Sequence, residues 1–222
     1  MPSVTRAVEV KLPEAEFLAD LYGIAFDLDI AEELCSKVVD LGKSKPRDFF
    51  VEEGLVSAAV IKYGRCFTKG VRMRLGVNDL AGLDPDNITA HEYFIELRNK
   101  FVAHSVNAFE ETYVTVSARE KGGEIFPITS VGPGQHRIVL SAETAESLKN
   151  LVSNMKSVVK RMIDVEEKRL LEFIQTLPLE VIHAGDLHIP RNIQANDVRK
   201  PRKRGMHSNK SLQGRRAKTH AP

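Results

Sequence analysis

Apolar residues recur every three or four positions through the first part of the chain, and this period favours a helix there. Pro13 suits a first helical turn, and Gly42 suits a position just after a helix. The apolar residues between them include Phe17, Leu21, Ile24, Leu28, Cys35 and Val38. A spacing near 3.6 residues places such side chains on one face. The sequence therefore predicts a long amphipathic helix whose apolar face must be covered by other elements.

Two more helices are predicted before the middle of the chain. One runs from about 46 to 67, and its expected apolar face includes Phe50, Leu55, Ala58, Ala59 and Ile61. The other runs from about 90 to 106, because Thr89 and Glu92 have the spacing of a capping box. The intervening residues 72–87, RMRLGVNDLAGLDPDN, are predicted to be a polar loop with at most one short turn.

The period then changes from helical to alternating, which predicts a small antiparallel meander. The alternating segments are residues 113–117, 125–131 and 137–140. Gly122-Gly123 is the expected hairpin turn between the first two, and Gly132-Pro133-Gly134 is the expected turn before the third. Pro127 cannot donate a ladder hydrogen bond, so an edge or a bulge is expected there.

The longest helix is expected after the meander, with Ser141 as its cap and an end near Leu177. Its apolar residues include Leu148, Val152, Met155, Val159, Met162 and Leu170. The predicted fold class is therefore mainly α. Four helices form an up-and-down arrangement within residues 1–185, and the small β insertion occupies about 111–140, before the last long helix.

The net charge of +2 conceals an acidic body and a basic tail. From Arg191 to the end there are ten Lys and Arg residues and one acid, Asp197, which leaves 22 basic and 29 acidic residues before it. Residues 186–222 are also poor in aromatic side chains, so they are predicted to form a disordered arm. Such a block of like charge suits an interaction tail that binds nucleic acid or an acidic partner.

Several classes of protein are disfavoured by the sequence. No apolar run is long enough to cross a membrane, and the first residues lack the apolar core of a secretory signal. The two cysteines, Cys35 and Cys66, lie in helical patterns and are expected to be small buried residues of a cytoplasmic protein.

The stretch ELRNKFVAHS, residues 96–105, carries the strongest candidate for chemistry. On a helical wheel, Arg98 and His104 fall on opposite borders of the apolar stripe formed by Phe94, Leu97 and Phe101. They are also about 9 Å apart along the axis, so one phosphate would be reached more easily by two helices across a two-fold axis. A structural role remains open, because Arg98 can pair with Glu96 or Glu110, and a helical histidine often satisfies a core hydrogen bond.

Arg-Asn followed by four residues and a histidine, late in a helix of a four-helix protein, resembles the signature of the HEPN superfamily. Many members of that family are metal-independent endoribonucleases. The resemblance covers the helices, about 13–178, and implies catalytic roles for Arg98, Asn99 and His104. The meander has no counterpart in the core of that family. A histidine titrates near neutral pH and suits proton transfer, whereas an arginine fork suits a phosphate.

Other basic and aromatic residues are candidates for RNA binding. Around the end of the second helix these are Tyr63, Arg65, Lys69, Arg72 and Arg74, and in the tail they include Arg202, Lys203 and Arg204. A solvated basic loop that pairs with the acidic body is an equally good interpretation of the first group. His183 and His188 flank Asp186, but this spacing matches no metal-ligand pattern, and no cofactor is expected.

The leading hypothesis is an endoribonuclease that cleaves RNA through its own 2′-hydroxyl and acts as a homodimer. The resemblance implies a toxin or phage-defence setting, with an antitoxin or another acidic protein as a possible partner. The alternatives are a non-catalytic helical module that binds RNA, a nucleotide or a protein, and a structural dimer whose Arg98 and His104 only organise an interface.

Overall fold

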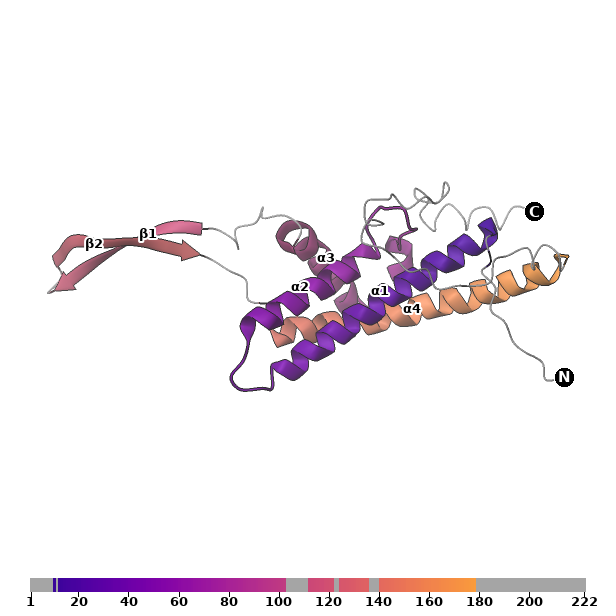
Figure 1. The fold of residues 1–222 in the computed structure, drawn as a ribbon, viewed down its shortest axis with the longest axis horizontal. Helices are drawn as coiled ribbons and strands as arrows, with labels where there is room; N and C mark the ends of the chain where they lie inside the picture. The colour runs from indigo at the N-terminus through magenta and orange to yellow at the C-terminus, as the bar shows by residue number, and fades with distance from the viewer. Residues whose placement is uncertain (1–9, 11, 103–111, 122–123, 136–139, 179–222) are drawn as a thin grey trace, which may run out of the picture. The chain divides into compact units, whose positions relative to one another are not determined.

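The computed structural model describes residues 10, 12–102, 112–121, 124–135 and 140–178 (Figure 1). Its long elements are α1 (Pro13–Leu41), α2 (Phe49–Arg65), α3 (Pro85–Leu97), α4 (Ala142–Gln175), β1 (Thr112–Lys121) and β2 (Glu124–Gln135). A 3-10 turn, η1 (Val77–Leu80), precedes α3, and a π-helical turn, η2 (Arg98–Val102), follows it. The prediction of a mainly α fold is therefore confirmed. In the described part of the chain, no helix is both long and apolar enough to cross a membrane.

The chain divides into two compact units, and α1 and α4 each contribute one part to both. Of the described residues, unit 1 contains those up to Ile30, residues 65–83 and residues 152–178. Unit 2 contains residues 31–64 and 84–151.

In unit 1, α1 and α4 run antiparallel and are joined by polar contacts between their exposed edges. Lys156 pairs with Asp29 at 2.7 Å, and the Tyr22 hydroxyl donates to Glu167 at 2.6 Å. The buried side chains of these two helices include Leu18, Leu21, Ile24, Leu28, Val152, Met155, Val159 and Leu170. The predicted periods of both helices are thereby confirmed. Residues of the connecting segment, Cys66, Met73, Leu75 and Leu80, are buried as well.

The buried face of α2, in unit 2, differs from the prediction. Its buried residues are Glu52, Val56, Ala59, Val60, Tyr63 and Gly64, whereas Phe50 is 77% exposed. The buried face is rotated relative to the predicted one because Glu52 can be buried. The Arg47 guanidinium donates to both carboxylate oxygens of Glu52. The helix also begins at Phe49 rather than Pro46, with the Asp48 carboxylate accepting from the Val51 amide.

The start of α3 was also predicted wrongly, five residues too late. Asp84 is the cap, and its carboxylate accepts from the Asn87 amide at 2.8 Å, while Pro85 takes the first helical position. Thr89 lies inside the helix, and its hydroxyl donates to the Pro85 carbonyl. An aspartate followed by proline therefore prevails over the threonine. The predicted end of this helix, beyond residue 102, lies outside the described residues.

The two strands form an antiparallel ribbon (Figure 1), and each strand is an edge. The register runs from Thr112 opposite Gln135 to Lys121 opposite Glu124. Pro127 falls where β2 has one residue more than β1, so the predicted edge or bulge is confirmed.

Gly132-Pro133-Gly134 is not the predicted turn, because β2 continues through it. At an edge, Pro133 need not remove a ladder hydrogen bond. Gly134 lies under the ring of Tyr113, where a side chain would collide. The Gly122-Gly123 turn and most of the predicted third strand lie outside the described residues. Beyond them, the predicted cap of α4 is confirmed, since the Ser141 hydroxyl accepts from the Thr144 amide at 3.5 Å.

Candidate functional site

Two of the three residues of the Arg-Asn-x4-His pattern, Arg98 and Asn99, are described, and they lie where α3 changes into the π-helical turn. The Nη1 atom of Arg98 donates to Oδ1 of Asn99 at 2.7 Å. Arg98 is partly buried, and Asn99 is exposed. Single π-helical turns are frequent at functional sites. His104 lies outside the described residues, so its predicted role stays a prediction.

The side chain of Arg98 packs across the end of α2. Its aliphatic stem lies against Gly64, a buried residue that is the second-last of that helix. In the part of unit 2 that the structure describes, the side-chain partner of the Arg98 guanidinium is therefore a neutral amide, and its stem rests on a helix backbone.

A second polar pair joins the same two helices. The hydroxyl of Tyr63, a fully buried residue, lies 2.7 Å from Nδ1 of His91, and the two rings meet edge to face at 5.9 Å. Burial lowers the pKa of His91, and the charge of Glu92 opposes this shift. At the pH of most cells the imidazole is therefore neutral, and either it or the phenol can be the donor.

His91 was not among the predicted site residues. It precedes Arg98 by seven positions, which is almost two full helical turns, so both side chains start from the same face of α3. The seven-residue spacing is the sequence signal that could have identified His91. Its tyrosine partner could not be identified in this way, because Tyr63 comes from another helix.

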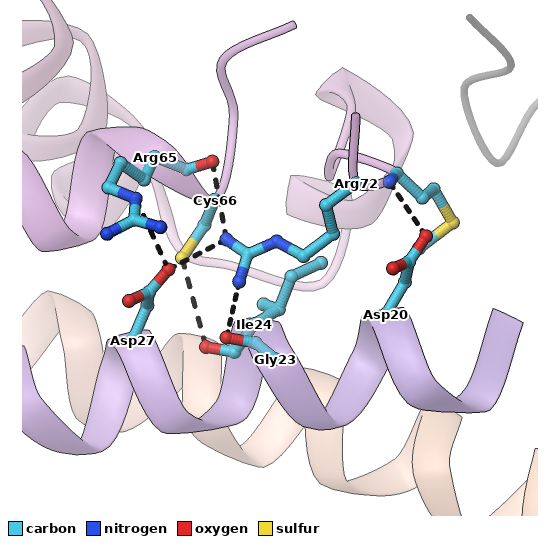
Figure 2. Close-up of polar contacts among 8 residues, drawn as sticks. Asp20, Gly23, Ile24, Asp27, Arg65, Cys66 and Arg72 are labelled. Carbon is cyan, nitrogen blue, oxygen red and sulfur yellow. Dashed lines mark hydrogen bonds and ion pairs between the residues drawn. The ribbon is translucent and has the colours of Figure 1, made fainter. Parts of the chain in front are cut away.

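The basic group around the end of α2 is only partly available for RNA. Tyr63 is buried, so its ring offers no face to a nucleobase. The side chain of Arg72 packs against α1 (Figure 2), where its guanidinium donates to the Gly23 carbonyl and pairs with Asp27 at 2.8 Å. Its side chain is only 15% exposed. The predicted roles of these two residues are therefore replaced by structural ones.

The acids that hold this segment come from the buried side of α1. Asp27 also lies 3.7 Å from Arg65, and Asp20 accepts from the Met73 amide at 2.9 Å (Figure 2). In the sequence, Asp20 and Asp27 lie next to the apolar positions of α1. That placement is the signal that could have indicated buried polar partners for these two carboxylates. Arg65, Lys69 and Arg74 are exposed, so RNA binding by these three stays a prediction. Arg202, Lys203 and Arg204 lie outside the described residues.

Both cysteines are buried, as expected from their helical patterns. Burial raises the pKa of Cys35 to about 12, which keeps it a thiol. The thiol of Cys66 lies 3.9 Å from the Ile24 carbonyl (Figure 2). Neither residue therefore has the exposure of a nucleophile, and Cys35 also lacks the low pKa of one.

The described residues contain no group of three or more His, Cys, Asp or Glu side chains placed to hold a metal ion. His183, Asp186 and His188 are not among them. Comparisons with models of protein families, with curated proteins and with solved structures found no match to this chain. The candidate site is consequently defined by its own geometry, centred on Arg98, Asn99, Gly64 and the Tyr63–His91 pair.

Proposed function

We propose that this protein is a metal-independent endoribonuclease of the HEPN type. The observation that supports the proposal best is the state of Arg98. Its guanidinium is bound by the neutral amide of Asn99, at a break in the α-helix, and not by a carboxylate of the described residues. It therefore keeps its full charge and several N–H donors for a phosphate.

In this proposal, the RNA supplies the nucleophile. The 2′-hydroxyl attacks the adjacent phosphorus, the new O–P bond forms, and the bond to the 5′-oxygen breaks. His104 transfers protons, taking one from the 2′-hydroxyl or delivering one to the leaving oxygen. Arg98 stabilises the charge that develops on the phosphorane oxygens, and Asn99 orients Arg98. The products are a 2′,3′-cyclic phosphate and a 5′-hydroxyl.

The proposal includes a HEPN-like four-helix arrangement of α1–α4 and a homodimer. On the helical wheel Arg98 and His104 are offset by about 120° and by about 9 Å along the axis, so a composite site would take one from each copy. Mixing an Arg98→Ala chain with a His104→Ala chain should then restore part of the activity. An active protein that is strictly monomeric by light scattering would contradict the composite site.

The direct test is incubation of purified protein with mixed RNA in EDTA, followed by analysis of the cleaved ends. Wild-type protein should cleave and leave cyclic phosphate ends. His104→Ala, purified in the same way, should be slower by about 10²–10⁴-fold because proton transfer is lost. Arg98→Ala should be slower by about 10²–10³-fold because a charge-stabilising donor is lost, and both variants should remain folded. A strict need for magnesium, or binding without cleavage, would reject the nuclease and favour the alternative of a non-catalytic binding module.

The basic tail has a separate role in the proposal, as an arm that attracts RNA to an acidic body. Deletion of residues 199–222 should weaken RNA binding and flatten its dependence on salt, since fewer counterions are released. Turnover of bound RNA should change little. If both affinity and salt slope persist, an acidic protein, such as the antitoxin of a toxin or phage-defence system, becomes the better partner for the tail.

A further inference from the structure

Gly64 occupies a position in α2 where the backbone does not require glycine. Its φ lies in the ordinary range, so alanine would be compatible with the helix. The three heavy atoms nearest to the Cβ atom of an alanine there all belong to one side chain. A Cβ atom there would lie 2.9 Å from Cγ, 3.3 Å from Cδ and 3.5 Å from Cβ of Arg98. The arginine can therefore cross α2 on this path only because residue 64 has no side chain.

The collision of an alanine Cβ with Arg98 would occur at Cγ, close to the backbone of the arginine, so it cannot be relieved by a small movement. A clash with the tip of a long side chain is relieved by a small rotation of the last bonds. Relief at Cγ requires a change of the first side-chain torsion, and that change moves the whole guanidinium by several ångströms. Gly64 thus restricts the direction in which Arg98 leaves α3.

The neighbouring residue restricts the spacing between the two helices. Tyr63 is buried beside Gly64, and its hydroxyl meets His91 at 2.7 Å, two helical turns before Arg98. Since both contacts join α2 to α3, a change at either residue alters the depth at which the arginine stem rests.

We infer that Tyr63 and Gly64 form an arginine seat that positions Arg98 for phosphate, with Gly64 as the specific positioning residue. The catalytic meaning of this seat rests on the proposed nuclease function. Its geometric content does not, because the direction of the Arg98 side chain can be measured without RNA.

The test compares Gly64→Ala with Gly54→Ala, a matched change in the same helix where nothing lies within 4 Å of the added carbon. Gly54→Ala should leave RNA cleavage unchanged. Gly64→Ala should lower kcat by about tenfold to a hundredfold, with little change in KM, because the fork is displaced from the reacting phosphate. Equal activity of the two variants would overturn the seat as a catalytic feature.

Two measurements judge the seat independently of cleavage. The Nε–H NMR signal of Arg98, assigned by its loss in Arg98→Lys, should shift in Gly64→Ala and stay unchanged in Gly54→Ala. Gly64→Ala should also lower Tm in the wild-type background but not in an Arg98→Ala background, where the colliding atoms are absent. An unshifted signal, or equal Tm effects in both backgrounds, would refute the seat. Wild-type protein that does not cleave RNA would refute only the proposed function.

Discussion

Among the described residues, Arg72 and Arg98 each lie over a helix glycine, and their guanidinium groups have different partners. Arg72 crosses Gly23 of α1, where an added Cβ would lie 3.1 Å from its Nη1 atom. Arg98 crosses Gly64 of α2. The first ends at a buried carboxylate, Asp27, and the second ends at an exposed amide, Asn99. Both were predicted to bind phosphate, but of the two only Arg98 has an uncharged side-chain partner among the described residues.

The comparison shows that two arginine stems that each cross a helix glycine can end at chemically different partners. A guanidinium paired with a carboxylate that is only 7% exposed holds two segments together and has little affinity left for an anion. A guanidinium held by an amide is directed without being neutralised. The group that binds each guanidinium, Asp27 for Arg72 and Asn99 for Arg98, is therefore the first feature to compare by mutation.

The largest effect is expected from removing the carboxylate of the first arginine. Asp27→Ala leaves Arg72 mostly buried without its ion-pair partner, so the free energy of unfolding should fall by about 3 kcal/mol. Urea denaturation followed by circular dichroism measures this.

Two controls accompany that variant. Arg65→Ala removes the more exposed and longer ion pair of Asp27, and it should cost less than about 1 kcal/mol. Arg98→Ala should cost about 1 kcal/mol or less, mainly through lost packing of its stem. If Arg98→Ala destabilises the protein as much as Asp27→Ala, both arginines are structural and the comparison fails.

A smaller effect is expected at the pair that sets the spacing of α2 and α3. Tyr63→Phe removes the hydroxyl that meets His91, and leaving that partner unsatisfied should cost about 1–2 kcal/mol of unfolding free energy. Tyr93→Phe is the matched control, because Tyr93 is half exposed on α3. Equal stability of both variants would mean that the Tyr63–His91 bond contributes nothing.

The same pair should make unit 2 sensitive to weak acid. Burial lowers the pKa of His91 below 6.5, so the unfolded chain takes up a proton before the folded chain does. The contribution to stability is complete above pH 6.5 and is lost as pH falls through the lowered pKa. Titration of the His91 ring by NMR gives this pKa. An unfolding free energy whose slope between pH 7.5 and 5 is the same in His91→Gln would contradict the prediction.

The smallest effect at neutral pH is expected at the other bonded tyrosine. Tyr22 donates to the carboxylate of Glu167, and this hydrogen bond, with burial and the negative charge, raises its pKa to about 12. Its contribution to stability is therefore present below pH 10 and is lost as pH rises toward 12. Absorbance at the tyrosinate band should show one late-titrating phenol that Tyr22→Phe removes. A late phenol that persists in this variant would assign the shift to another tyrosine.

Regular periods made α1 and α4 predictable, because their apolar residues, the proline at the start of α1 and the serine cap of α4 all indicate the same boundaries. The face of α2 was unpredictable from local pattern, since a buried glutamate depends on an arginine that precedes the helix. The start of α3 depended on two capping sequences that compete within six residues, and the aspartate–proline pair prevailed.

The candidate site was predictable to a similar extent. Arg98 and Asn99 were predicted to belong to one site, but their hydrogen bond to each other was not predicted, since Glu96 and Glu110 were the expected partners of Arg98. Gly64 and Tyr63 gain their meaning only when α2 lies against α3, and no local pattern indicates that contact. The π-helical turn likewise has no recognised sequence signal here, and we have no physical account of why it begins at Arg98.

The β ribbon has a practical consequence for the dimer experiment. Val114, Val116 and Val131 are exposed, and the register places them on one face of the ribbon. An exposed apolar row on a sheet with two edges favours self-association as protein or salt concentration rises. Light scattering can therefore report a pair of chains that shares no active site. Val116→Thr keeps the shape of that side chain and makes the row more polar, so a dimer that persists in this variant is the one relevant to complementation.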